Sequence, residues 1–123
     1  MKLAIRLLVT GWLLGVAVAA AHAQEVFQPG NGVSLPTVVS EVKPEYTPEA
    51  KRAHIEGNVI VDAVVLADGK VGTVKVARSL DGGTFGLDQE AVKAAKQWTF
   101  KPGRKNGKPV AVRVSIELTF RLK

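Results

Sequence analysis

The stretch that decides the fold is VAVRVSIELTFRL, residues 110–122. A large apolar residue stands at every even-numbered position, and every odd-numbered position except Ala111 is polar. Successive side chains of a strand point to opposite faces, so this pattern predicts a long β-strand with one buried face and one face in water. At the usual rise per residue it is about 40 Å long, and we expect it to extend beyond its neighbours.

Two further strands are expected at residues 58–67 and 70–79, on either side of Asp68-Gly69. Both runs are rich in β-branched residues, and the Asp-Gly pair tolerates the positive φ angles of a tight hairpin turn. The first run is apolar on both faces apart from Asp62, which indicates an interior strand.

Two segments carry helix signals. Thr47 is a suitable N-cap and Pro48 a suitable first residue for a short helix that ends before Gly57. Residues 87–98 change to a helical period, with one apolar stripe that is rich in alanine and suited to close packing on a sheet. The stripe consists of Leu87, Ala91, Ala94, Ala95 and Trp98.

The order helix-strand-strand-helix-strand predicts an α+β domain over residues 36–123. We expect a three-stranded antiparallel sheet with both helices on its apolar face, because the connection 98–110 is long enough to return the last strand beside the first. Residues 24–35 contain Pro29 and two glycines without a sustained period, so they are predicted to be a flexible N-terminal arm.

Residues 1–23 have the features of a signal peptide. Lys2 and Arg6 precede the apolar run 7–20, and Ala21-His22-Ala23 offers small residues for cleavage before Gln24. The alternative is an inner-membrane anchor over Leu7–Ala23. The apolar run spans only about 21 Å as a helix, less than the ~30 Å hydrocarbon core, so export to the periplasm with cleavage is favoured.

The charge and composition of the remaining 100 residues exclude several classes of function. Loss of Lys2 and Arg6 lowers the basic count from 17 to 15 against 11 acidic residues, which leaves a net charge of +4. The cations are interspersed with acids, so nucleic acid is not expected as a partner. The absence of cysteine excludes disulfides, thiolate metal sites and a thiol nucleophile.

Candidate catalytic residues are few, and each has a simpler interpretation. His54 has no evident partner for a triad or a metal site and is expected at the surface of a helix end. Asp62 is expected to point to solvent, and Asp81-Gly82-Gly83 lacks the lysine and the spacing of a phosphate loop. Tyr46, Trp98 and Phe100 are interpreted as packing residues. We expect no enzyme, no cofactor, no metal and no small-molecule substrate.

Five groups of residues, in order and at compatible spacings, resemble the C-terminal domain of the TonB energy-transducer family. They are Pro44-Glu45-Tyr46, Glu56-Gly57-Asn58-Val59, Asp68-Gly69-Lys70-Val71, Trp98-Thr99-Phe100-Lys101-Pro102 and Asn106-Gly107-Lys108-Pro109-Val110. The resemblance covers residues 36–123. It implies a periplasmic protein-binding module whose sheet is extended by a strand from an outer-membrane, plug-containing barrel transporter, linked to energy-dependent transport.

The resemblance implies that the partner pairs with the last strand by β-augmentation, in which main-chain hydrogen bonds supply affinity. The expected partner-binding residues are Val110, Val112, Arg113, Val114, Ser115, Ile116, Glu117 and Thr119. The charges on this strand are equally suited to protecting an exposed edge from unwanted pairing. An alternative function is a periplasmic scaffold that forms a homodimer through the same edge, without energy transduction.

The sequence departs from the transducers of this family in two respects. Those proteins carry an uncleaved N-terminal helix that engages a motor and a long proline-rich linker that crosses the periplasm. The arm expected here reaches only about 40 Å when fully extended. Binding is therefore the firmer expectation, and energy transduction by this chain alone is the weaker one.

Overall fold

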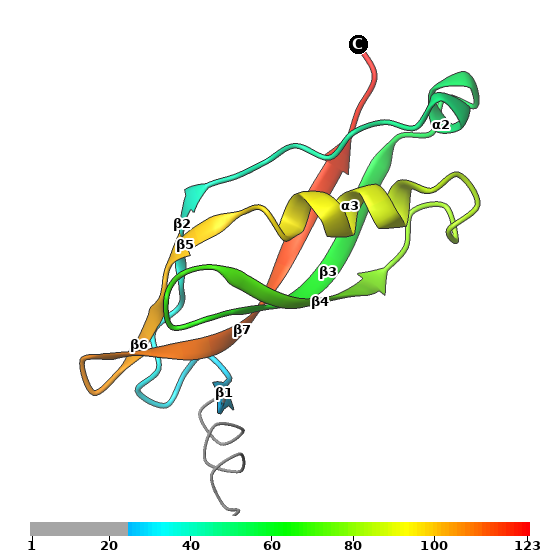
Figure 1. The fold of residues 1–123 in the computed structure, drawn as a ribbon. Coiled ribbons are helices and arrows are strands. Elements are labelled where there is room, and N and C mark those ends of the chain that lie inside the picture. Colours follow the sequence, from blue (N-terminus) through cyan, green and yellow to red (C-terminus); the bar gives the residue numbers. More distant parts are fainter. Residues whose placement is uncertain (1–24) are drawn as a thin grey trace, which may run out of the picture.

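The computed structural model describes residues 25–123 (Figure 1). Its longest strand is β7 (Lys108–Phe120). It lies antiparallel to β3 (Gly57–Val65), and the other side of β3 pairs with β4 (Val71–Arg78). The predicted hairpin and the predicted long last strand are both confirmed. Strand β7 also extends beyond the end of β3, as its length required.

The sheet has more strands than the sequence predicted, and it is mixed. Strand β1 (Val26–Phe27) pairs parallel with β7, and β6 (Gly103–Lys105) forms a hairpin with the start of β7. Strands β2 (Thr37–Ser40) and β5 (Thr99–Lys101) make a small separate sheet. These four strands are two to four residues long, too short for a hydrophobic period to develop.

The short helix α2 (Pro48–Arg52) begins as predicted. The Thr47 Oγ1 atom accepts a hydrogen bond from the Ala50 amide at 3.1 Å and donates one to the Phe85 carbonyl at 2.7 Å. One hydroxyl therefore caps the helix and ties it to the loop that precedes the second helix.

The second helix, α3 (Leu87–Ala95), is shorter than predicted. The amides of Gln97 and Trp98 bond to carbonyls three residues earlier, which tightens the chain and leads it into β5. Trp98 is therefore outside the helix and only half-buried, whereas the sequence placed it on the helical stripe and in the core.

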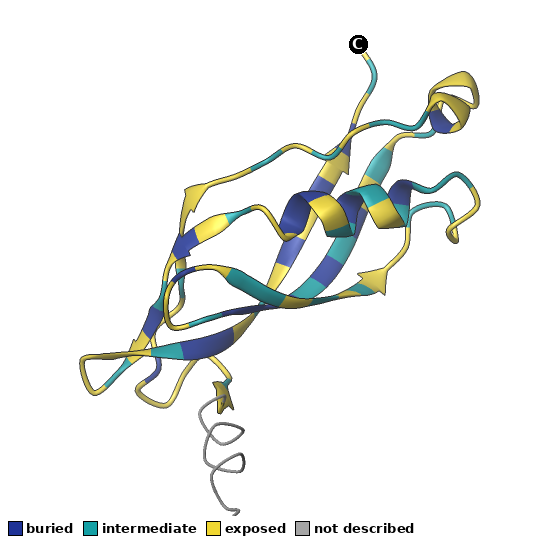
Figure 2. Cartoon of the chain, in the orientation of Figure 1, coloured by how far each residue is buried: buried dark blue, intermediate teal, exposed yellow. Residues whose placement is uncertain are grey.

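The core lies between α3 and one face of the sheet (Figure 2). Helix α3 packs on β3, β4 and β7, as predicted, but α2 lies at one end of the sheet and buries only Ala50. The fully buried large side chains are Phe120, Leu87, Leu118, Val59, Val61, Val65 and Val112. Every buried core residue of the described part lies between Val33 and Phe120, so the chain from Gln24 onward contains this core entire.

The predicted flexible arm is attached to the domain over its described part, residues 25–35. Val26 and Phe27 pair with β7, the Ser34 amide donates to the Arg104 carbonyl at 3.0 Å, and Val33 is only 8% exposed. The predicted signal peptide and its cleavage site lie outside the described residues. In residues 25–123, no helix is long and apolar enough to cross a membrane.

Two turn glycines at similar positive φ angles give a matched test of the packing. Gly69 has φ of +88°, and a Cβ atom there would collide with the Phe100 carbonyl oxygen. Gly107 has φ of +77° with nothing within 4 Å of a Cβ atom. We expect Gly107→Ala to lower the free energy of unfolding by about 1–2 kcal/mol, from backbone strain alone. Gly69→Ala should lower it by about 1–3 kcal/mol more, because β5 must also move.

Urea denaturation of the two variants and the parent measures the difference. Equal losses for the two glycines would contradict the close approach of β5 to the β3–β4 turn.

Candidate functional site

One side of β7 is paired along its first part and free along the rest. Residues 112–120 pair with β3 on one side, while on the opposite side β1 pairs only with Ala111 and Val112. From Arg113 to Phe120, no described strand pairs with this second side. A free edge presents backbone amides and carbonyls that are available to another chain.

A groove of about 520 Å³ runs along this free edge. One wall is β7 from Arg113 to Glu117, the opposite wall comes from the N-terminal segment, and aromatic side chains lie between them. The residues that line it outside β7 are Gln28, Pro29, Leu35, Pro36, Val38, Asp62, Trp98 and Phe100.

A second hollow of about 390 Å³ continues the groove toward the C-terminus. The two share Trp98 and Glu117, so together they follow β7 from Arg113 to Arg121. The far wall of this second part comes from the segment 41–46. Two adjoining, partly open hollows thus lie along the free edge.

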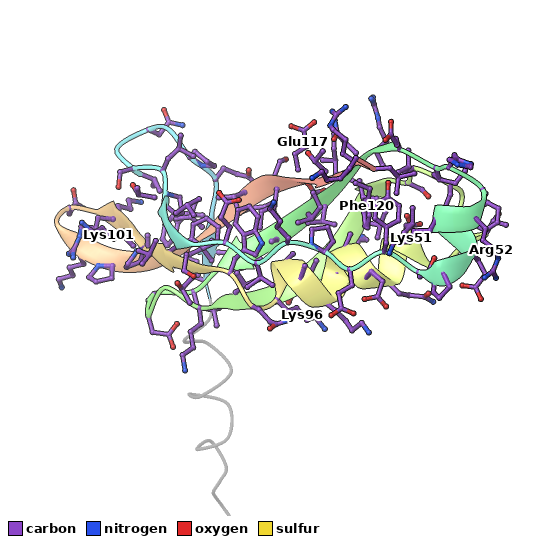
Figure 3. All side chains as sticks on the ribbon, turned by 90° about the horizontal axis from the view of Figure 1, so that it is seen from above. Lys51, Arg52, Lys96, Lys101, Glu117 and Phe120 are labelled. Atoms are coloured by element: carbon purple, nitrogen blue, oxygen red, sulfur yellow. The ribbon has the colours of Figure 1, made fainter. Side chains whose placement is uncertain are left out.

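The polar residues of β7 stand on the face away from α3. Glu117 accepts a hydrogen bond from Asn58 Nδ2 at 2.6 Å, and the Ser115 hydroxyl donates to Asp62 Oδ1 at 3.4 Å. Figure 3 shows Glu117 and Phe120 on opposite sides of β7, consistent with the exposed and buried alternation along the strand. Asp62 itself is half-exposed within β3.

The structure places six of the eight predicted binding residues on the free edge and two outside it. Val110 already pairs with Gly103, and Val112 is fully buried with Phe27 and Val65 as its partners. The prediction therefore set the start of the free edge too early. The six that lie on it are Arg113, Val114, Ser115, Ile116, Glu117 and Thr119.

The sequence did not reveal the far wall of the groove. The Trp98 indole donates from Nε1 to the Val42 carbonyl at 3.0 Å and stacks on Phe100 with 6.1 Å between ring centroids. These contacts hold the segment 36–44 in position across the groove from β7. The segment is rich in β-branched residues and bounded by Pro36 and Pro44, a composition that favours an extended chain but does not identify what the chain packs against.

Tyr46 closes the C-terminal end of the groove. Its hydroxyl donates to the Ile55 carbonyl at 2.6 Å, and its ring meets Phe120 edge-on with 5.4 Å between centroids. Burial raises the pKa of Tyr46 above its usual value of 10.0; the nearby Glu56 carboxylate adds to the rise, and Arg121 opposes it. The expectation that Tyr46 packs in the domain is met, and the same ring lines the groove.

The candidate catalytic residues of the sequence analysis are not brought together in the described residues. His54 is exposed, with φ of 56°, just after α2. In residues 25–123 no three histidine, aspartate or glutamate side chains gather as metal ligands would. Four large apolar side chains of the described part are exposed, Val26, Leu35, Val38 and Val39, and two of them, Leu35 and Val38, line the groove.

Comparison with known proteins gives one consistent result. The profile of the family described as Gram-negative bacterial TonB protein C-terminal matches residues 42–122. The chain is 38% identical over 91 residues to the protein TonB of Vibrio cholerae, covering 73% of this chain and 36% of that protein. It is 39% identical over 79 residues to the protein tonB2 of Pseudomonas aeruginosa, covering 64% and 28%.

The fold is similar to that of a solved structure from the same group. The solution NMR structure of the Pseudomonas aeruginosa TonB CTD has a TM-score of 0.57 and 26% identity, covering 76% of this chain and 90% of that one. The chain spans about a third of the length of the curated relatives it matches.

The raised pKa of Tyr46 predicts a pH dependence of stability. The folded state keeps the phenol proton to a higher pH than the unfolded state does. This contribution to stability is therefore complete below about pH 10 and is lost as the pH rises toward the folded-state pKa.

We expect Tyr46→Phe to have a lower free energy of unfolding than the parent at pH 8. The difference between the two proteins should become smaller above pH 10. Denaturant titrations from pH 8 to 11.5 measure it. A gap that stayed constant to pH 11.5 would contradict the burial of the hydroxyl.

Proposed function

The chain belongs to the family of Gram-negative TonB C-terminal domains, and on that premise we propose that it is a periplasmic protein-binding module. Its partner is an outer-membrane transporter, which contributes an extended segment that pairs with β7. The module thereby takes part in energy-dependent transport across the outer membrane. The activity proposed is binding, without catalysis.

The observation that carries this proposal is the unpaired edge of β7 facing a groove. Main-chain groups from Arg113 to Phe120 are free on that side, and a strand of about eight residues, roughly 26 Å long, matches this length. Main-chain pairing gives affinity for an extended segment of many sequences.

The walls of the groove supply the means to select among segments. Alternate side chains of an added strand point to opposite faces. Those on the core side meet Trp98, Val38 and the rest of the apolar wall, whereas those on the other side meet Arg113, Ser115 and Glu117. The segment expected to bind best alternates apolar with polar residues and lacks proline at the paired positions.

The sheet has a second free edge on β4, but its surroundings differ. Strand β4 pairs only with β3 among the described strands, and none of the three hollows described for the domain is lined by a β4 residue. An added strand on β4 would gain main-chain bonds without an opposite wall. This difference favours β7 as the binding edge.

We also propose that the protein acts in the periplasm after cleavage before Gln24. The mass of the protein recovered from cells, together with fractionation, tests this. A mass that begins at Gln24 in the periplasmic fraction supports it, and full-length protein in the inner membrane would replace it with an anchor over Leu7–Ala23.

A second candidate function is self-association through the same edge. The exposed Leu35, Val38 and Val39 side chains beside it favour this alternative. Sedimentation velocity up to millimolar concentration distinguishes the two. We expect a monomer, because Arg113 and Glu117 charge the edge and the segment 35–46 leaves room for one strand but obstructs a second domain.

Two neighbouring valines provide a matched test of the groove. Val38 is 43% exposed and lines it, whereas Val39 is 60% exposed and does not. We expect Val38→Glu to weaken the binding of a strand-forming peptide about tenfold, because a carboxylate replaces apolar contact on the wall. Val39→Glu should change the affinity less than twofold.

The probes are synthetic ten-residue peptides from the N-terminal segments of plug-containing outer-membrane transporters, titrated into isotope-labelled protein. Backbone amide shifts should concentrate on residues 113–120. Shifts centred on β4, or equal effects of the two valine variants, would overturn the proposed site.

A further inference from the structure

Four exposed or half-exposed cations gather at the end of the domain where β5, β6 and the start of β7 meet. They are Lys101, Arg104, Lys105 and Lys108, and Lys70 lies beside them through its bridge to Thr99. None of the five lines the groove. In the sequence, no acidic residue occurs between Glu90 and Glu117.

Two of these cations are cross-strand neighbours, and the repulsion between them lowers the stability of the folded domain. Lys105 and Lys108 are directly paired across the β6–β7 hairpin, on either side of the Asn106-Gly107 turn. Like charges at directly opposite positions of an antiparallel pair repel each other. Departures from locally favourable sequence occur at functional sites more often than elsewhere.

The cations at this end have no carboxylate partner in the described residues. The one ion pair found within residues 25–123 joins Lys93 to Glu90, both on α3. Arg104 donates to the Gly107 carbonyl at 3.0 Å, and the Lys105 ammonium lies 4.8 Å from the centre of the Phe27 ring. Of the nearby acids, Asp68 accepts from the Lys70 amide rather than from an ammonium group.

The N-terminal side of the chain reaches the domain at this same end. Strand β1 pairs with Ala111 and Val112, next to the hairpin, and Phe27 contacts Lys105. The first described residues of the chain therefore pack beside the cationic end.

We propose that this cationic end docks on anionic phospholipid headgroups at a membrane surface that faces the periplasm. Each Lys or Arg near such a surface raises the affinity about fivefold, so four give a few-hundredfold to thousandfold preference over neutral lipid. That is enough to bind the domain reversibly to such a surface in one orientation, and the affinity falls with added salt. Docking leaves the groove free, because the groove runs along β7 beyond the hairpin.

The test compares two triple variants of the chain from Gln24, which contains the whole described core. The first is Arg104→Gln, Lys105→Gln and Lys108→Gln at the cationic end. The control is Lys51→Gln, Arg52→Gln and Lys96→Gln, which removes the same charges from exposed sites away from that end (Figure 3). Binding to phosphatidylglycerol vesicles and to phosphatidylcholine vesicles is measured by co-flotation at 50 mM salt.

We expect the parent to bind only the phosphatidylglycerol vesicles, the cationic-end variant to bind about a hundredfold more weakly, and the control to stay within threefold of the parent. Equal losses in both variants would reduce the effect to net charge and overturn the proposal. So would an absence of parental binding, or a stronger affinity for lipopolysaccharide or peptidoglycan sacculi than for phosphatidylglycerol.

A second measurement guards against misfolding of the variant. Lys108→Gln alone should unfold at the same or a higher urea concentration than the parent, because it relieves the repulsion with Lys105. It should also bind phosphatidylglycerol vesicles about fivefold more weakly. Loss of stability without loss of vesicle binding would overturn the proposal.

Discussion

The ladder between β3 and β7 is the interaction on which the rest of the structure depends. It joins nine residue pairs, from Gly57 opposite Phe120 to Val65 opposite Val112. A shift by one residue would turn Ile116, Leu118 and Phe120 from the core to water, so the hydrophobic pattern fixes this register. With β3 on one side of β7, the other side of the strand is left for a different partner. The core and the candidate site are therefore two consequences of one pairing.

The elements that the sequence predicted correctly are those whose pattern is long enough to be read. The 13 residues of β7 alternate without interruption, the Asp68-Gly69 pair marks the β3–β4 turn, and the alanine-rich stripe marks α3. The elements it missed, β1, β2, β5 and β6, are held by pairing with residues distant in sequence, and their own composition carries no period. The same reason explains the end of α3. In the sequence Trp98 continues the helical stripe. In the structure its indole donates a hydrogen bond to the Val42 carbonyl, and the chain turns into β5.

The candidate site likewise has one part that the sequence predicts and one part that it does not. Its β7 wall follows from the sequence, because alternation names the residues that share each face of a strand. The two residues placed on the edge in error, Val110 and Val112, are covered by β6 and β1, which only the tertiary structure reveals. The opposite wall needs the Trp98–Val42 bond and the β2–β5 pairing, both between segments about 60 residues apart. A binding edge can thus be predicted from one strand, whereas a groove requires knowledge of the contacts between strands.

Under the proposed function, the position of the two surfaces on β7 decides how tension in a paired segment would reach the domain. The cationic end lies at the start of β7, and the groove follows the same strand toward Phe120 near the C-terminus (Figure 1). A strand paired with the free edge of β7 and pulled along its own axis loads its main-chain hydrogen bonds together. A strand pulled away from the edge breaks them one at a time. Because β7 is also paired with β3 over nine residues, a pull along its axis is resisted by the ladder that holds the core. In the proposed function, the strand that pairs with the extended segment is thus also the strand that the ladder ties most firmly to the core.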